Sequence, residues 1–117
     1  MTYFEGFIVP VPEANKDAYR KHASDFAPLV QDIGVGRMAE AWESDVPDGK
    51  VTDFKGAVKA TTDEKVVYSW IEWPSKEVRD EGRKKMMEDS RMQQGKAAMP
   101  FDGQRMIYGG FATVLAA

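Results

Sequence analysis

The chain has 117 residues, of which 43% are hydrophobic and 30% are charged. This composition is typical of a globular protein and excludes wholesale disorder, so we expect one domain over residues 1–117 with a single modest core. The formal net charge of −3 disfavours a nucleic-acid partner, which normally meets a basic stripe.

The chain contains no cysteine, which excludes a disulfide framework, a thiolate metal site and a cysteine nucleophile. Its one histidine, His22, has no second histidine at metal spacing, so we expect no metal and no other cofactor. No secretory leader is evident, and no apolar run approaches the roughly 20 residues that cross a bilayer. We therefore expect a cytoplasmic protein without a membrane partner.

The first half of the chain predicts a strand, a helix and a second strand. Residues 3–11 read as a strand in which Gly6 indicates a bulge or the close approach of another backbone or a ligand. Apolar residues recur at helical spacing from about 13 to 33, and Gly34 ends that helix. Residues 35–43 form the second predicted strand.

The regular pattern then lapses for about twenty residues. Pro47 and Gly49 indicate a turn, and Thr52 or Asp53 is a candidate cap for a short helix that reaches Val58. Compact domains rarely carry an insertion of this length without a use for it. Residues 66–73 follow as the most strand-like run, with β-branched and aromatic residues on both faces.

The last part of the chain predicts a second helix and a final strand. Ser75 is the expected N-cap of a helix ending near Asp89. Gly82 in its interior costs about 1 kcal/mol relative to alanine, which indicates close packing there. A shorter turn from Ser90 is expected to bring Met92 inward, and residues 105–115 form the last strand.

The order strand–helix–strand–strand–helix–strand predicts an α+β fold, a ferredoxin-like βαββαβ sandwich with a four-stranded antiparallel sheet. The two long helices would cover one face. Neither face of the predicted sheet is consistently polar, so leaving the second face in water would expose a patch larger than monomers tolerate. We therefore predict a homodimer in which two sheets pack face to face as a dimeric α+β barrel.

Four separated segments resemble one bacterial family, and they occur in the same order. They are Tyr-Phe-Glu-Gly-Phe (3–7), Asp-Val-Pro-Asp-Gly-Lys-Val-Thr-Asp-Phe (45–54), Ser-Trp-Ile-Glu-Trp-Pro-Ser-Lys (69–76) and Met-Pro-Phe-Asp-Gly-Gln-Arg-Met-Ile-Tyr-Gly-Gly-Phe (99–111). The chain is thereby similar to the YbaA-like family of uncharacterised proteins over essentially its whole length. The resemblance implies a dimeric α+β barrel and implies no activity, substrate or cofactor.

Acids within apolar strands are the candidate chemistry. Glu40 and Glu72 lie beside Trp42 and Trp70, and Glu5 occupies a similar place in the first strand. A carboxyl group on a covered sheet face is retained only when it is paired or used, so Glu40 and Glu72 are candidate general acids or bases. The alternative is that the glutamates form ordinary ion pairs and the tryptophans are core residues.

A pocket between sheet and helices would bring these acids together with the candidate ligand-binding residues, which are Trp42, Trp70, Met86 and Arg105. Residues 45–53 would form its lid. We predict small-molecule binding as the function. The alternatives are an enzyme resembling cofactor-independent monooxygenases or isomerases, and a non-catalytic dimeric interaction domain. The sequence leaves all three open.

Overall fold

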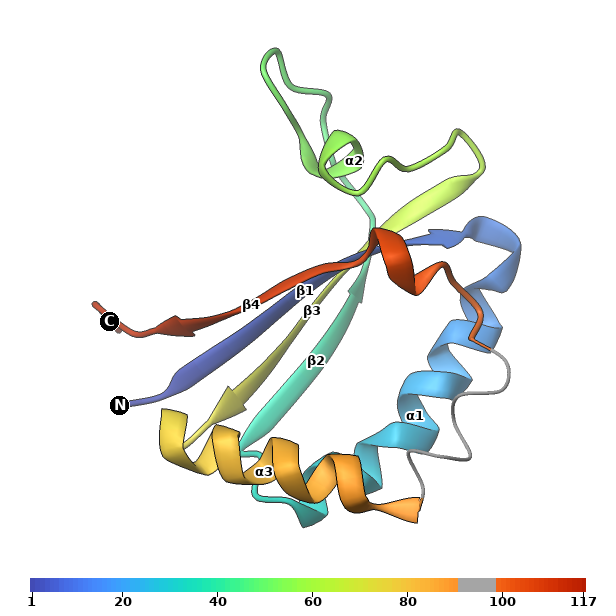
Figure 1. The fold of residues 1–117 in the computed structure, drawn as a ribbon. Helices are drawn as coiled ribbons and strands as arrows, with labels where there is room; N and C mark the ends of the chain where they lie inside the picture. The colour runs from blue at the N-terminus through green and yellow to red at the C-terminus, as the bar shows by residue number, and fades with distance from the viewer. Residues whose placement is uncertain (91–98) are drawn as a thin grey trace.

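The structure is a computed structural model that describes residues 1–90 and 99–117. Its elements follow the predicted order (Figure 1). In chain order they are β1 (Tyr3–Pro12), the 3-10 turn η1 (Glu13–Asn15), α1 (Lys16–Asp32), β2 (Arg37–Trp42), α2 (Phe54–Ala57), β3 (Glu64–Trp73), α3 (Lys76–Glu88), the 3-10 turn η2 (Gly103–Arg105) and β4 (Ile107–Ala112).

The four strands form one sheet in the order β2-β3-β1-β4, and every neighbouring pair is antiparallel. The two ten-residue strands, β1 and β3, occupy the centre, as expected for the two runs that are apolar on both faces. This strand order with its two long helices confirms the predicted ferredoxin-like α+β fold.

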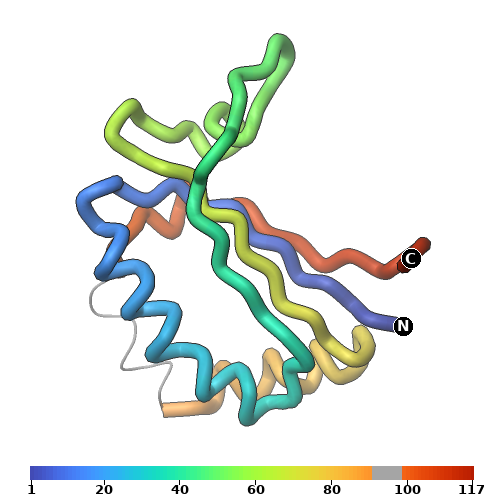
Figure 2. Tube along the Cα trace, turned by 180° about the vertical axis from the view of Figure 1, so that it is seen from behind, coloured from blue at the N-terminus to red at the C-terminus, as the bar shows by residue number. Residues whose placement is uncertain are grey.

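The helices α1 and α3 lie on the same face of the sheet, which we call the helix face (Figure 2). Residues of odd number in β1 and β3 point toward it, and they supply most of the buried strand residues. Two buried clusters fill the space between sheet and helices. The first cluster contains Leu29, Val30, Ile33, Val35, Ile71 and Trp73. The second cluster contains Val9, Val11, Tyr19 and Val67.

The opposite face of the sheet, which we call the open face, is not covered by α1 or α3 (Figure 1). The even-numbered residues of β1 and β3 point into it, and register adds residues 107, 109 and 111 of β4. At one end α2 contacts β3, and Val58 and Val66 are buried there. Elsewhere the open face keeps Tyr68 46% and Phe111 60% exposed.

Two helix caps follow the prediction closely. The Asp53 carboxylate, rather than Thr52, accepts a hydrogen bond from the Gly56 nitrogen at 2.6 Å and caps α2. The Ser75 hydroxyl accepts one from the Val78 nitrogen at 3.2 Å and caps α3. Both caps were predictable because a side-chain oxygen that satisfies a nearby backbone donor is a local feature of sequence.

Some element ends differ from the prediction. The first helix begins at Lys16, after the η1 turn, and β2 is shorter at each end than the expected 35–43. The last strand begins at Ile107 and not at 105, because the Asp102 side chain accepts from the Gln104 nitrogen and starts the η2 turn. The predicted turn around Met92 lies outside the described residues.

No helix in the described ranges is long and apolar enough to cross a membrane.

Candidate functional site

A concavity of about 680 Å³ lies on the open face of the sheet. β1, β3 and β4 all contribute to it, and its lining residues are Phe4, Glu5, Gly6, Tyr68, Trp70, Glu72 and Phe111. The Glu5 side chain belongs to the helix face, so the polar side chains that border the concavity are those of Glu72 and Tyr68. The site is thus an aromatic depression with one carboxylate.

Two glycines explain why the sheet is hollow at this point. Gly6 is the Cα partner of Gly109 on β4 and of Trp70 on β3, so two neighbouring positions on the open face carry no side chain. A Cβ placed on Gly6 would lie 3.7 Å from the Phe111 ring, which is ordinary van der Waals contact. The floor is therefore bare backbone, and larger side chains stand around it.

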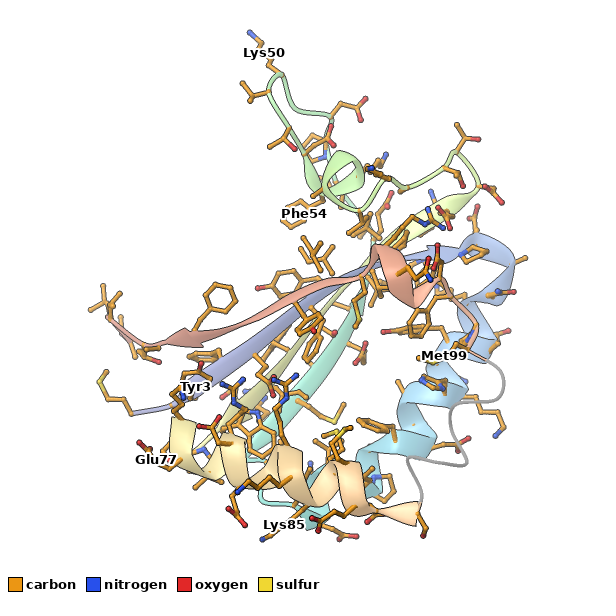
Figure 3. The ribbon with its side chains drawn as sticks, in the orientation of Figure 1. Tyr3, Lys50, Phe54, Glu77, Lys85 and Met99 are labelled. Atoms are coloured by element: carbon orange, nitrogen blue, oxygen red, sulfur yellow. The ribbon has the colours of Figure 1, made fainter. Side chains whose placement is uncertain are left out.

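Aromatic rings form the walls and continue toward α2. The Tyr68 and Trp70 rings meet edge to face with centroids 5.8 Å apart. Phe54, which is labelled in Figure 3 at the start of α2, meets the Tyr68 ring edge to face with centroids 6.5 Å apart. Because Phe54 and Tyr68 come from separate segments, this contact ties α2 to the rim of the concavity.

Glu72 is held by a tryptophan and not by a cation. The Trp70 Nε1–H donates to Glu72 Oε2 at 3.0 Å, and the glutamate is half-buried. Arg37, its Cα partner on β2, is exposed, and no described cationic group lies within 4.0 Å of the Glu72 carboxylate. A half-buried carboxylate without a counter-ion at the border of an apolar hollow is the most distinctive electrostatic feature of the open face.

Glu40, Trp42 and Met86 lie on the other side of the sheet. Glu40 and Trp42 pair with Ser69 and Val67 of β3, which point toward the helices, and Met86 packs against the core cluster below α3. The predicted pocket between sheet and helices therefore cannot contain all the residues assigned to it, because Trp70 and Glu72 face the opposite way. Lys16 lies over the Trp42 ring at 5.5 Å, which gives that tryptophan a packing partner on α1.

The Glu40 carboxylate is hydrogen-bonded to α1. The Tyr19 hydroxyl donates to Glu40 Oε1 at 2.5 Å. Desolvation beside the first turn of α1 raises the pKa of Glu40, while hydrogen bonds from Tyr19 and Ser69 lower this pKa. The same surroundings raise the pKa of the Tyr19 hydroxyl, first through burial and then through Glu40. This pair joins α1 to β2 at a distance from the concavity.

Arg105 is engaged in an ion-pair network away from the open-face concavity. Its guanidinium binds both carboxylate oxygens of Glu64 at 2.7 Å and donates to Asp102 at 2.9 Å and to the Lys59 carbonyl at 2.9 Å. Because Arg105 donates to it, the pKa of Glu64 falls to about 2. The residue fastens η2 to the start of β3 and is not among the lining residues.

Glu5 is a buried, paired acid of the helix face. The Trp73 Nε1–H donates to Glu5 Oε1 at 2.8 Å, and Arg79 and Arg83 of α3 lie 3.4 and 3.9 Å from Oε2. Arg79 also lies over the Tyr3 ring at 4.9 Å. For this glutamate the ordinary ion-pair interpretation of the sequence is confirmed.

Residues 44–53, which we call the arm, extend beyond the end of the sheet (Figures 1 and 3). Asp53 holds its base by accepting from the nitrogens of Gly49 and Gly56. Val51 on the arm is 99% exposed. Phe54, directly after the arm, reaches the rim of the concavity through its contact with Tyr68. The role of residues 45–53 as a lid stays a prediction.

Metal ligands do not gather in the part of the chain that the structure describes. No group of three or more histidine, aspartate or glutamate side chains there could hold a metal ion. His22 is half-buried and meets the Phe101 ring edge to face at 5.8 Å, which is a packing contact.

Sequence reasoning found Trp70 and Glu72 and missed the other walls of the concavity. Phe4 and Phe111 were recognisable as strand aromatics, but which strand faces coincide depends on register. The signal that could have located the site is the pair Gly6 and Gly109, because two strand glycines that meet across a ladder leave a gap on the one sheet face that they share.

Fold and site together define a class: a ferredoxin-like α+β protein whose apolar sheet face carries a ligand-sized hollow. The chain belongs to the family described as "Protein of unknown function (DUF1428)", whose model matches residues 2–103. It is 58% identical over 115 residues to the uncharacterized protein YbaA of Escherichia coli K12, with 98% of each chain covered, and equally to that of Shigella flexneri. The family resemblance seen in the sequence is confirmed.

Two solved structures share the fold at low identity. Rv0793 from Mycobacterium tuberculosis matches with a TM-score of 0.53 and 12% identity, covering 100% of this chain and 99% of that one. A nipsnap family protein of unknown function from Agrobacterium tumefaciens matches with a TM-score of 0.54 and 16% identity, covering 94% and 86%. At these identities the likeness supports the fold alone.

Proposed function

We propose that this protein is a homodimer that binds a small molecule in the concavity of the open face, between two sheets packed face to face. The observation that supports this most directly is the coincidence of the concavity with the uncovered apolar face. A second copy would cover the exposed rings and would turn an open depression into an enclosed chamber. This places the proposed pocket on the opposite face from the one expected from the sequence.

The exposed apolar residues of the open face support a second copy as the cover. Tyr68, Ile107 and Phe111 are all large, exposed and on this face or its edge strand. Monomeric proteins rarely leave contiguous apolar patches of this kind in water, and a two-fold interface uses the same patch on both subunits.

The dimer is tested by replacing Phe111 with glutamate. A carboxylate buried in an apolar interface loses its hydration, so we expect Phe111→Glu to dissociate the dimer in light scattering at concentrations where the wild-type chain is dimeric. Met87→Glu is the matched control, because Met87 is an exposed apolar residue of α3, away from the open face. A wild-type monomer at high concentration, or a Phe111→Glu dimer of unchanged affinity, contradicts the proposal.

Ligand binding is tested by filling the floor. The Gly6→Val variant places a β-branched side chain over the hollow at a position where a Cβ meets only ordinary contact. We expect mass spectrometry of solvent extracts to find a small molecule in freshly purified wild-type protein and to find it depleted in Gly6→Val. Ala41→Val, on β2 outside the lining, is expected to retain it; equal content in all three proteins argues against the site.

A catalytic version of the proposal rests on Glu72 alone. Glu40 lies on the helix face, so the two acids cannot act on the same substrate as a pair. A single carboxylate beside Trp70 can serve as a general base in an isomerase-like or cofactor-independent oxygenase-like reaction. The aromatic lining and the bare floor support binding more directly than they support either reaction.

A non-catalytic interaction domain is the second candidate, and the arm favours it. Within one copy of the chain, the Val51 side chain of the arm stays 99% exposed. Contact with a second copy or another protein would give that side chain a role. The cytoplasmic location expected from the sequence stays a prediction.

A further inference from the structure

We propose that the concavity recognises an organic cation, an amine or quaternary ammonium group carried on a small apolar body. The inference rests on the proposed function, since it names the class of ligand for the same site.

The first argument is charge. Among the lining residues that the structure describes, Glu72 contributes the one carboxylate that borders the concavity, and none is a lysine, an arginine or a histidine. The Glu5 carboxylate is turned to the helix face and is already paired with Arg79. An enclosed chamber with an unpaired carboxylate disfavours an anion, and a neutral apolar molecule would leave the charge without compensation. A cation is the ligand that neutralises it.

The second argument is the composition of the walls. Phe4, Tyr68, Trp70 and Phe111 all stand around the bare floor. A cation over an aromatic face is attracted by the negative centre of the ring, most strongly by tryptophan, and cages of aromatic rings are a general means of binding quaternary ammonium groups. An acid beside several rings supplies both the long-range attraction and the close contact.

The third argument is the geometry of Glu72 and Trp70. The indole nitrogen donates to Oε2, which fixes the carboxylate beside the ring. No described group donates to the other oxygen, Oε1, so it can accept a hydrogen bond from an ammonium N–H or contact a methylated one. A volume of about 680 Å³ accommodates the cationic group together with a body of several carbon atoms.

Arg37 is the alternative partner for Glu72. It is the Cα partner of Glu72 across β2 and β3, and it is exposed. An arginine that moved to the carboxylate, from the same chain or from a second copy, would neutralise it without a ligand. This alternative predicts that removing Arg37 strengthens cation binding, or that removing the Glu72 charge leaves cation binding unchanged. Variants of Arg37 and Glu72 test these two predictions.

The test uses three probes of nearly the same shape on the full chain: choline, the neutral 3,3-dimethylbutan-1-ol and the anionic 3,3-dimethylbutanoate. Binding is followed by calorimetry and by tryptophan fluorescence. We expect choline to bind at least about tenfold more tightly than the alcohol, which corresponds to about 1.4 kcal/mol, and the carboxylate not to bind.

The Glu72→Gln variant retains an acceptor for Trp70 and removes the charge. We expect it to lose roughly tenfold or more in choline affinity and little in affinity for the alcohol. Glu77→Gln is the control: it makes the same change of charge on the exposed side of α3 and should bind choline like the wild type. Arg37→Gln should bind choline with the same affinity as the wild type, whereas a clearly stronger affinity would show that Arg37 occupies the carboxylate in place of a ligand.

Choline binding no tighter than that of the alcohol, or unaffected by Glu72→Gln, overturns the inference. Binding of the alcohol that is abolished by Gly6→Val would then preserve the proposed function while the cation inference fails. If none of the three probes binds, the cation inference fails as well, and the proposed function is judged by its own tests of dimerisation and retained ligand.

Discussion

The four glutamates that lie within the described strands are held differently because their partners differ. Glu5 is buried between Trp73 and arginines of α3, Glu64 is clasped by Arg105, and Glu40 is bonded to Tyr19. The fourth, Glu72, has an indole N–H and no described cation beside it. Strand position identified such acids, but their partners lie as far as 74 residues away in sequence, so only the fold decides which acid is available for a ligand.

At the scale of one residue, the Glu64–Arg105 pair gives a pH prediction. Arg105 lowers the pKa of Glu64 from 4.5 to about 2, so the folded chain binds this proton less tightly than the unfolded chain does. The resulting stabilisation is complete above pH 4.5 and is lost as the pH falls toward 2. Glu64→Gln should lower the free energy of unfolding at neutral pH by about 1–3 kcal/mol, since it leaves Arg105 with a weaker acceptor.

The measurement is urea unfolding, followed by tryptophan fluorescence, at a series of pH values. The difference between wild type and Glu64→Gln should shrink below pH 4.5 and disappear near pH 2. Glu77→Gln, which is exposed on α3, should follow the wild type throughout. A difference of constant size across the series would show that the ion pair does not cause it.

At the scale of an element, α3 is fitted to the sheet through one glycine. A Cβ on Gly82 would lie 2.6 and 2.7 Å from two atoms of the Trp73 ring, closer than real Cβ contacts allow. The ring is fully buried and its nitrogen is hydrogen-bonded to Glu5, so it cannot easily give way. The close packing predicted from a glycine in a helix interior is confirmed.

The Gly82→Ala variant tests this fit. Alanine gains about 1 kcal/mol in helix propensity, but overpacking a buried site costs roughly 1–3 kcal/mol, and here the contact is too short to be relieved by small shifts. We expect a net loss of stability in thermal unfolding. Glu81→Ala, the exposed neighbour on α3, should be neutral or slightly stabilising. Equal stability of Gly82→Ala and the wild type would mean that α3 can shift away from Trp73.

The elements that were predictable from sequence are those set by local interactions. The caps Asp53 and Ser75 satisfy donors three residues ahead, so their type and spacing are visible in the chain. The sequence prediction began β4 too early, at Arg105. In the structure Arg105 belongs to η2, because its guanidinium is bound by Asp102 and by Glu64, which is distant in sequence. Long-range partners of this kind leave no periodic signal.

At the scale of the molecule, the order of strands and helices was enough to predict the topology, but not the site. Alternation places Glu40 with Trp42, and Trp70 with Glu72, within their own strands. Whether the two pairs share a face depends on register, and the structure aligns Glu40 with Ser69 and Arg37 with Glu72. A shift of one residue would have put all four together, which is why the sequence alone could not separate the two faces.

The arm gives a prediction at the same scale. Deleting residues 44–60 would also remove Val58, which is buried, so a point substitution is the sharper test of arm contacts. If the arm binds the second copy, Val51→Asp should weaken self-association about tenfold or more in sedimentation experiments and leave the unfolding of the dilute chain unchanged. Met87→Asp is the control, and unchanged self-association of Val51→Asp argues against an arm contact.

The paired glycines of the floor have a consequence for selectivity. β1 lies between β3 and β4, so the peptide groups around Gly6 are engaged by neighbouring strands on both sides. A ligand bound over Gly6 therefore finds no free backbone donor or acceptor there. Its polar atoms must be recognised by the side chains that surround the concavity. Related chains could therefore change the depth of the chamber by exchanging a single small residue, and change its preferred charge by exchanging a residue of the border, with each adjustment independent of the other.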